Sequence, residues 1–246
     1  LKPLPFREPE RIVRIWESRL EQGWERASVA PGNFWDFREM NRTFEDLGAY
    51  RFSSANLTGM EIPERLSVGR VSAGFFGQVL AVRPVLGRTF LPEEGEADHP
   101  FVAVLSYGLW QRWFGGDPQV VGRFLSVSGY QIEVIGVMPA EFEFPAPEYD
   151  AYTQLQLDRE DPWERNNHYL GAVARLSPGT TLDEARAEVE VMAARATEDY
   201  PVYYPNTGWW NQWFYNDPPN PERWKWIDFH MDLTSDGPSD VIEVAI

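Results

Sequence analysis

The sequence predicts an α+β fold, in which a split βαβ-βαβ lobe is interrupted by a second small α+β lobe. Strand–helix–strand patterns occupy both ends of the chain, and the middle has helices and a hairpin of its own. The chain has 246 residues, 43% of them apolar, which is enough to bury a real core. We therefore expect one discontinuous lobe from residues 1–72 and 151–246 and an inserted lobe from residues 73–150.

The front of the chain supplies the first strand–helix–strand pattern. RIVRIWESRL (11–20) begins with β-branched residues and predicts a strand. PGNFWDFREMNRTFEDLGAY (31–50) predicts a helix with Asn33 as its N-cap. Its shared apolar face comprises Phe34, Phe37, Phe44 and Leu47. Residues 51–73 are strand-like, with turn signals at Thr58-Gly59 and Pro63.

The middle of the chain predicts the inserted lobe. SAGFFGQVL (72–80) predicts a short helix capped by Ser72, and FVAVLSY (101–107) predicts a short buried strand. RFLSVSGYQIEVIGVMP (123–139) alternates on both sides of Ser128-Gly129, so it predicts a β-hairpin.

The stretch SYGLWQRWFGGDP (106–118) has two interpretations, an aromatic ligand platform or a helix that packs on the sheet of the inserted lobe. Trp110 and Trp113 recur at helical spacing, and Gly115 suits the end of a helix. Asp117-Pro118 then starts another helical turn. The helical spacing favours packing.

The back of the chain supplies the second strand–helix–strand pattern. A strand at 169–176 ends at Pro178-Gly179, and Thr181 with Glu184 forms a capping box. The long amphipathic helix that follows has an apolar face of Leu182, Ala185, Val189, Met192, Ala193 and Ala196. WKWIDFHMDL (224–233) predicts a closing strand, and we expect the last dozen residues to be loose.

Charge and motifs exclude several classes of function. The net charge of −16 repels phosphate backbones, so we expect no nucleic-acid partner. The absence of cysteine excludes disulfides and thiolate chemistry. No P-loop, G-x-S-x-G or G-x-G-x-x-G is present, so we expect no catalytic residue, no cofactor and no bound nucleotide.

The start of the chain indicates a piece of a longer protein. The first residue is Leu1, and neither a signal peptide nor a run of about 18 apolar residues follows it. We expect a fragment of a longer protein or, alternatively, a processed mature protein.

The histidines and acidic residues predict neither a metal site nor an active site. His99, His168 and His230 lie far apart and lack the close spacing of a zinc-ligand pair. An acidic group does not follow the order of a calcium loop, so we interpret it as a solvated loop. This group comprises Glu93, Glu94, Glu96 and Asp98.

Glu141 and Glu143 alternate with Phe142 and Phe144. Paired carboxylates beside aromatic rings occur in glycoside hydrolases. A spacing of two residues on a strand, however, places both acids on one face and the rings on the other. A half-exposed strand without catalytic activity accounts for the pattern.

A Trp-rich segment near the C-terminal end has three competing interpretations. Core packing, a carbohydrate-stacking surface and anchoring at a membrane interface all fit this composition. The candidate membrane-proximal or partner-contact residues are Trp209, Trp210, Trp213, Trp224 and Trp226.

Taken together, these blocks make the chain resemble the MacB-like periplasmic core domain of ABC-transporter permeases, in particular the bacterial orphan-permease type. The blocks that carry the resemblance are LPFREPERIVRIWE (4–17), SVAPGNFWDFREMNRTFEDLGAY (28–50), NLTGMEIPERLSVGRVSAGFFGQVLAVRPVLGRTFLPEE (56–94), VLSYGLWQRWFGGDPQVVGRFLSVSGYQIEVIGVMPAEFEFP (104–145) and NHYLGAVARLSPGTTLDEARAEVEVMAARATEDYP (167–201). Their order and spacing follow the family. The segment 208–226 departs from it, because the family usually passes quickly to a closing strand there.

The resemblance implies a non-catalytic extracytoplasmic domain between the first and second membrane helices of a permease in the cell inner membrane. The split lobe would be the porter-like part, and His168, which matches a family position, would be structural. The implied partners are the membrane helices of the parent permease, a periplasmic adaptor protein, and a second copy in a homodimer or pseudo-dimer. The nucleotide would bind to separate cytoplasmic domains. The alternative function is a secreted carbohydrate-binding or glycan-cleaving protein, which the acidity and tryptophan content suggest.

Overall fold

The structure, a computed structural model, describes residues 6–19, 24–58, 63–96, 98–144, 149–159, 165, 167–199 and 242–245. The chain forms two compact units, each with its own core. The first unit comprises Glu10–Leu47 and Asp158–Ile246, and the second comprises Lys2–Pro9 and Gly48–Leu157. Strand β3 (Phe44–Thr58) belongs to both, because the division falls between Leu47 and Gly48.

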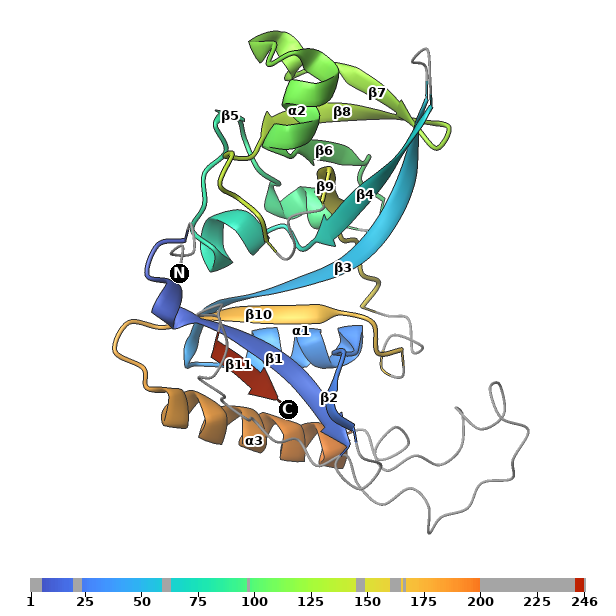
Figure 1. Cartoon of the computed structure of the whole chain (residues 1–246). Coiled ribbons are helices and arrows are strands. Elements are labelled where there is room, and N and C mark those ends of the chain that lie inside the picture. Colours follow the sequence, from blue (N-terminus) through green and yellow to red (C-terminus); the bar gives the residue numbers. More distant parts are fainter. Residues whose placement is uncertain are drawn as a thin grey trace, which may run out of the picture. The chain divides into compact units, whose positions relative to one another are not determined.

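The first unit is a mixed sheet with two helices (Figure 1). Its elements are β1 (Ile12–Arg19), β2 (Trp24–Ala27), α1 (Pro31–Met40), the start of β3, β10 (Gly171–Leu176), α3 (Leu182–Asp199) and β11 (Ile242–Ala245). The strands follow the order β11-β1-β10-β3, and β2 pairs with β1. β1 is antiparallel to β10 and parallel to β11.

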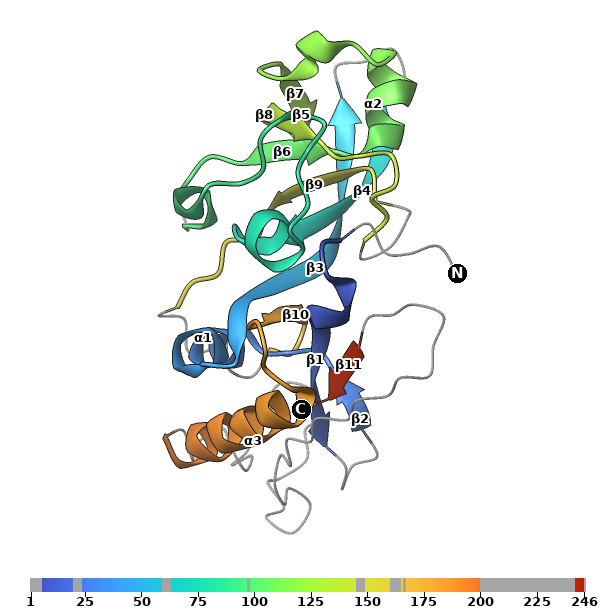
Figure 2. The ribbon, with the colours of Figure 1, turned by 90° about the vertical axis from the view of Figure 1, so that its left-hand side faces the viewer.

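Both helices of the first unit lie on the same face of its sheet (Figure 2). Helix α3 begins at the expected capping box, in which Glu184 Oε2 accepts from Thr181 N at 2.7 Å. The Glu184 backbone N–H donates in return to Thr181 Oγ1 at 3.3 Å. The apolar face that the sequence predicts is confirmed by the buried residues Ala185, Val189, Met192, Ala193 and Ala196.

Helix α1 is shorter than expected and has a different cap. It ends at Met40, and its N-cap is Ala30, so Asn33 is not the cap. The main chain leaves the helix because Glu188 of α3 accepts from the backbone N–H groups of Arg42 and Thr43, at 2.8 and 2.9 Å. As a result, the expected helical residues Phe44 and Leu47 lie buried on β3.

The C-terminal end also differs from expectation. Residues Ile242–Ala245 form β11 and pair with Val13–Trp16 of β1, so the expectation of a loose end is wrong for these residues. The expected closing strand at 224–233 lies outside the described residues.

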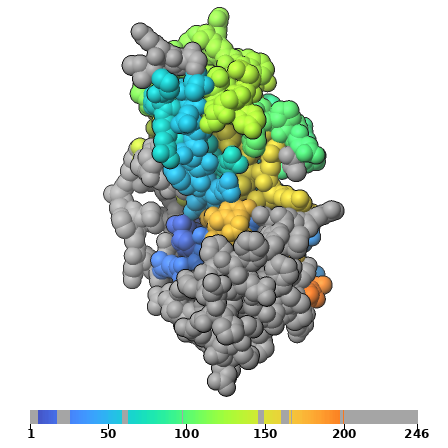
Figure 3. Space-filling view, turned by 90° about the vertical axis from the view of Figure 1, so that its right-hand side faces the viewer, coloured from blue at the N-terminus to red at the C-terminus, as the bar shows by residue number. Residues whose placement is uncertain are grey.

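The second unit contains the other strands of the same mixed sheet, which continues through β3. Its elements are the end of β3, β4 (Glu64–Val71), η3 (Phe75–Val79), β5 (Leu86–Gly87), η4 (Pro92–Gly95), β6 (Val102–Leu105), α2 (Tyr107–Phe114), η5 (Pro118–Val120), β7 (Phe124–Val127), β8 (Tyr130–Val137) and β9 (Ala151–Gln154). The strand order is β3-β4-β9-β6-β8-β5, and β7 pairs with both β3 and β8. Figure 3 shows the surface of β3, in cyan, beside that of β7 and β8, in yellow-green.

The units divide the chain at 47/48 and 157/158, and not at the expected 72/73 and 150/151. The reason lies in strand pairing. β4 pairs with β3 along its whole length and pairs in parallel with β9, from Val68↔Ala151 to Val71↔Gln154. The strands at 51–72 therefore belong to the second unit, although their sequence continues the pattern of the first.

Helix α2 confirms the packing interpretation of the aromatic stretch. Leu109 is fully buried, and Trp110 and Trp113 are half-buried against the same apolar cluster of the sheet. Ser106 Oγ caps the helix by accepting from Leu109 N at 3.1 Å, and Gly115 ends it with a φ of +58°. Trp110 Nε1 donates to the Asp117 carbonyl at 2.9 Å, which joins the helix to the following turn η5.

In the rest of the second unit, a strand and a hairpin are as expected and one helix is not. The strand at 102–105 is buried, and the β7–β8 hairpin is confirmed. The expected helix at 72–80 is a single π-helical turn at 75–79 that follows Gly74, so Ser72 is not its cap. Ser72 instead holds the neighbouring strand, because its Oγ accepts from Ala49 N at 3.1 Å.

Candidate functional site: fixed side chains near the passages between the units

The chain passes between the two units at residues 9/10, 47/48 and 157/158. Side chains held by several contacts lie within each unit. They are the candidates for a functional role in the described part of the chain.

A buried polar cluster joins three segments of the first unit. Glu17 of β1 is 2% exposed, and its Oε1 accepts from Ala30 N at 2.9 Å and from Asn33 Nδ2 at 2.7 Å. Its Oε2 lies 2.5 Å from His168 Nδ1, just before β10. Glu17 therefore binds the residue before α1 and a side chain of its first turn, near a helix start where a negative charge is favourable. His168 is structural, as expected from the resemblance.

The environment of Glu17 lowers its pKa. Burial alone would raise the pKa, but attraction to His168 and the hydrogen bonds from His168, Ala30 and Asn33 lower it by more. The carboxylate therefore stays charged inside the unit, paired with His168.

We expect the first unit to lose stability on acidification through this group. Because the folded pKa lies below the ordinary value of 4.5, the contribution of Glu17 is present above that value and is lost as the pH falls through the folded pKa. Urea unfolding at a series of pH values, compared between the original protein and Glu17→Gln, isolates this group from the other acids. Parallel pH profiles for the two proteins would contradict the assignment.

Two arginines fix the chain to α1 after the passage at 157/158. Arg165 forms a forked ion pair with Asp36, at 2.7 and 3.2 Å. Gly32 makes room for it, since a Cβ there would lie 2.4 Å from Arg165 Cγ. Arg159 pairs with Glu39 and stacks on the Trp35 ring, with its guanidinium carbon 4.6 Å from the ring centroid.

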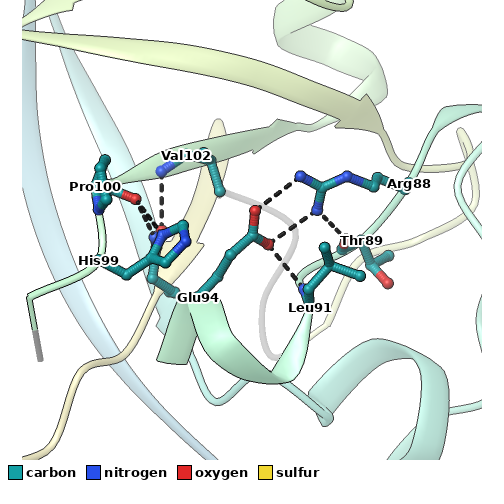
Figure 4. Close-up of polar contacts among 8 residues, drawn as sticks. Arg88, Thr89, Leu91, Glu94, His99, Pro100 and Val102 are labelled. Atoms are coloured by element: carbon teal, nitrogen blue, oxygen red, sulfur yellow. Dashed lines mark hydrogen bonds and ion pairs between the residues drawn. The ribbon is translucent and has the colours of Figure 1, made fainter. Parts of the chain in front are cut away.

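A second buried acid organises a loop of the second unit (Figure 4). Glu94 is 3% exposed and forms a forked ion pair with Arg88, at 2.7 and 2.9 Å. Its Oε2 also accepts from Leu91 N at 2.8 Å. Burial raises the pKa of Glu94, but these bonds lower it by more. The interpretation of a solvated acidic loop is therefore wrong for Glu94, while Glu93, Glu96 and Asp98 are exposed.

The aromatic core of the second unit surrounds Phe76, which is fully buried. Its ring centroid lies 5.2 Å from that of Tyr152 and 5.6 Å from that of Phe142. Burial raises the pKa of Tyr152, whose hydroxyl donates to the Phe144 carbonyl at 3.0 Å. The tyrosine is therefore a neutral structural donor.

Phe6 belongs to the same core, although it precedes β1 of the first unit by only a few residues. It is 6% exposed, and its ring centroid lies 5.5 Å from that of Phe144 and 6.2 Å from that of Phe142. The chain is thus fixed in the second unit just before it enters the first.

The sequence-predicted acids and histidines do not converge on a site. Glu141 and Glu143 are exposed and Phe142 is buried, as alternation predicts, but the segment is a turn at 140–141 followed by irregular chain, and not a strand. His99 lies in the second unit and His168 in the first, while His230 is outside the described residues. In the part of the chain that the structure describes, no group of three or more His, Asp or Glu side chains is arranged to hold a metal ion.

The Trp-rich candidate residues, Trp209, Trp210, Trp213, Trp224 and Trp226, lie outside the described residues. Their contact with a membrane or a partner stays a prediction. No helix within the described ranges has both the length and the apolar composition that a membrane crossing requires.

Comparison with known proteins decides the family. The MacB-like periplasmic core domain matches residues 4–191. The chain belongs to this family. It is a periplasmic core domain of a MacB-like ABC-transporter permease, and its mixed α+β fold is that of MacB periplasmic domains.

Solved structures support the fold of this MacB-like domain. The extracellular domain of the noncanonic ABC-type transporter YknZ from Gram-positive bacteria is 13% identical, with a TM-score of 0.53. The match covers 77% of this chain and 95% of that one. The periplasmic region of MacB from Actinobacillus actinomycetemcomitans is 10% identical, with a TM-score of 0.55 and coverage of 78% and 85%. No curated protein matches the chain.

Sequence reasoning missed Glu17, Glu94 and Phe6, although each left a signal. Glu17 follows Val13 and Ile15 at alternate strand positions, which places an acid on a buried face. Glu94 stands at the third position of a turn that begins with Pro92, where a side chain can accept from the residue before the turn. For Phe6, the sequence indicates only an apolar side chain. Its position in the core of the second unit could be seen only in the tertiary structure.

Proposed function

We propose that this MacB-like domain is a non-catalytic part of the permease that transmits ATP-driven motion outside the membrane. The observation that carries the proposal is the family match over residues 4–191. It is supported by the fold, because two units with separate cores can move as bodies while the chain that passes between them transmits force.

The fixed side chains support a mechanical and not a chemical role. Glu17 is tied to His168 and to the start of α1, and Glu94 is tied to Arg88 and to a loop. Arg159 and Arg165 hold the returning chain on α1. Each group is positioned by several contacts, which stiffens the unit that contains it.

In this proposal, we assign the porter-like lobe to the first unit and the inserted lobe to the second. The first unit consists of two chain segments on either side of the second unit's main segment, which is the organisation of a host domain and its insertion. The partners are the membrane helices of the parent permease in the inner membrane, a periplasmic adaptor, and a second copy or pseudo-copy of the domain. ATP binds elsewhere in the transporter.

Thiol labelling in the complete permease tests the location, since this domain has no cysteine. Val191→Cys on α3 and Tyr130→Cys on β8 replace side chains that are 68% and 70% exposed. In spheroplasts, we expect a membrane-impermeant maleimide to label both without lysis. Val189→Cys, at a position that is 1% exposed on the same helix, is the matched control and should stay unlabelled. Labelling of the exposed sites only after lysis would contradict an extracytoplasmic location.

The same preparation tests transmission of motion. Leu157 is 5% exposed and stands at the passage between the units. If ATP turnover moves the units, Leu157→Cys should be labelled at a rate that changes between an ATPase-active and an ATPase-inactive transporter, while Val191→Cys should not change. Equal rates at Leu157→Cys in both transporters would count against transmission through this passage.

A further inference from the structure

Two arginines of the second unit lie directly opposite each other on neighbouring strands. Arg51 of β3 and Arg70 of β4 are Cα partners in the antiparallel ladder, so their side chains share one face of the sheet. Both side chains are half-buried. Like charges in this position repel each other, which destabilises the pairing of the strands. An anion beside the two guanidinium groups would remove this repulsion.

The positive charge of Arg70 is not neutralised by an acid of the described residues. Its guanidinium carbon lies 5.3 Å from the centroid of the Phe101 ring, and its side chain makes no hydrogen bond or ion pair within the part of the chain that the structure describes. Burial and the charge of Arg51 both lower the pKa of Arg70. In Arg88, by contrast, the bond to Glu94 raises the pKa. The N–H donors of Arg70 are therefore available to a ligand.

A buried hydroxyl lies beside Arg70 on the same face of the sheet. Thr153 of β9 is the Cα partner of Arg70 in the parallel ladder, and it is 8% exposed. Strand β9 lies between β4 and β6, and Phe101 immediately precedes β6. The Arg70 side chain reaches the Phe101 ring, so it crosses the face of β9 that carries Thr153. Among the described residues the Thr153 hydroxyl makes no hydrogen bond, although a buried hydroxyl normally has a partner.

We propose that Arg51, Arg70 and Thr153 form a binding site for a small oxyanion, which is a carboxylate or a phosphate group. The Arg70 guanidinium supplies parallel N–H donors that match two oxygens of such a group, Arg51 adds a second positive charge, and the Thr153 hydroxyl donates to an oxygen. The Phe101 ring positions the Arg70 guanidinium. Binding of the anion removes the repulsion between the arginines and gives the buried hydroxyl a partner.

The site is complete within one compact unit, because all four residues belong to the second unit. It does not rest on the proposed function. A domain can transmit motion without binding an anion here, and an anion can bind to a domain that transmits nothing. Each proposal can therefore fail without the other.

Modification of arginine side chains in the whole 246-residue chain measures occupancy of the site. Phenylglyoxal reacts with accessible guanidinium groups, and mass spectrometry of the resulting peptides gives the rate at each arginine. At constant ionic strength, we expect sodium phosphate or sodium acetate in place of sodium chloride to slow the reaction of Arg70 roughly threefold or more, once the anion exceeds its dissociation constant. Arg65 is the matched control, because it is an exposed residue of β4 on the opposite face and should react at the same rate in all three salts.

Thr153→Val separates a binding role of the hydroxyl from a structural one. Valine has the shape of threonine without the hydroxyl, so in chloride we expect the urea midpoint of the second unit not to fall. The dissociation constant for phosphate, taken from the concentration dependence of the Arg70 rate, should rise roughly tenfold, because a hydrogen bond to a charged group is lost. Arg51→Gln, which removes the second charge, should raise the same constant.

Protection of Arg70 by phosphate, acetate or both supports the site, and the anion that protects more strongly identifies the class of ligand. Equal Arg70 rates in phosphate, acetate and chloride would overturn the proposal. So would a Thr153→Val protein that binds phosphate as tightly as the original, or one that loses stability in chloride. In either of these cases the hydroxyl does not serve a bound anion.

Discussion

Replacing Phe76 with alanine is expected to lower the free energy of unfolding of the second unit by about 3–5 kcal/mol. Phe76 is fully buried, and its ring is surrounded by those of Phe75, Phe90, Phe142 and Tyr152, at centroid distances of 5.6, 5.9, 5.6 and 5.2 Å. These rings come from a π-helical turn, two loops and a strand, so they cannot collapse together into the space left by the missing ring. Urea unfolding, monitored by hydrogen exchange of amides in the second unit, measures the loss of unfolding free energy.

Phe52→Ala is the matched control, because Phe52 belongs to the same unit and is 61% exposed. We expect this substitution to cost less than about 1 kcal/mol, since little apolar surface returns to water. Equal losses for the two variants would mean that Phe76 does not lie at the centre of the aromatic core.

Glu17→Ala is expected to lower the free energy of unfolding of the first unit by about 3–5 kcal/mol. The substitution leaves the buried Ala30 N–H, the buried Asn33 amide and the half-buried His168 ring without the carboxylate that they share. A buried donor that loses its acceptor does not regain water, so the whole desolvation cost appears in the stability. Denaturant unfolding near neutral pH, monitored by hydrogen exchange in β1 and α1, measures the loss.

Glu17→Gln separates the charge from the hydrogen bonds. The glutamine side chain keeps the size and the acceptor for Ala30 N and Asn33 Nδ2, but loses the negative charge beside His168. We expect a smaller loss of about 1–2 kcal/mol. A loss below about 1 kcal/mol in Glu17→Ala would show that Glu17 does not hold the start of α1 as described.

Structural elements that depend only on residues close together in the sequence could be predicted from it. The capping box of Thr181 and Glu184, the Gly115 end of α2 and the hairpin at Ser128-Gly129 each depend on residues within a few positions of one another. For the same reason the apolar face of α3 was predicted correctly, since helical spacing alone places those residues together. The family was also predicted from the order and spacing of sequence blocks, and the match over residues 4–191 confirms it.

Features that depend on contacts between residues far apart in the sequence could be seen only in the tertiary structure. The spacing of Phe44 and Leu47 fits a helix, and α1 ends before them because Glu188 of α3 binds the main chain at Arg42 and Thr43. The boundary of the units depends on β4, which fits either lobe by its sequence and joins the second because it pairs with β9.

The buried acids Glu17 and Glu94 were not predicted from the sequence. By composition, Glu17 and Glu94 are ordinary acids that should favour solvent. Glu17 is buried because partners far along the chain, His168 above all, supply the interactions that water would otherwise provide. Glu94 is buried with the help of nearby residues, since its forked partner Arg88 stands six residues before it. The sequence by itself determined the local elements and the family of this domain. Only the tertiary structure decided where helix α1 stops, which unit each strand joins and that Glu17 lies in the core, because each of these depends on contacts between distant residues.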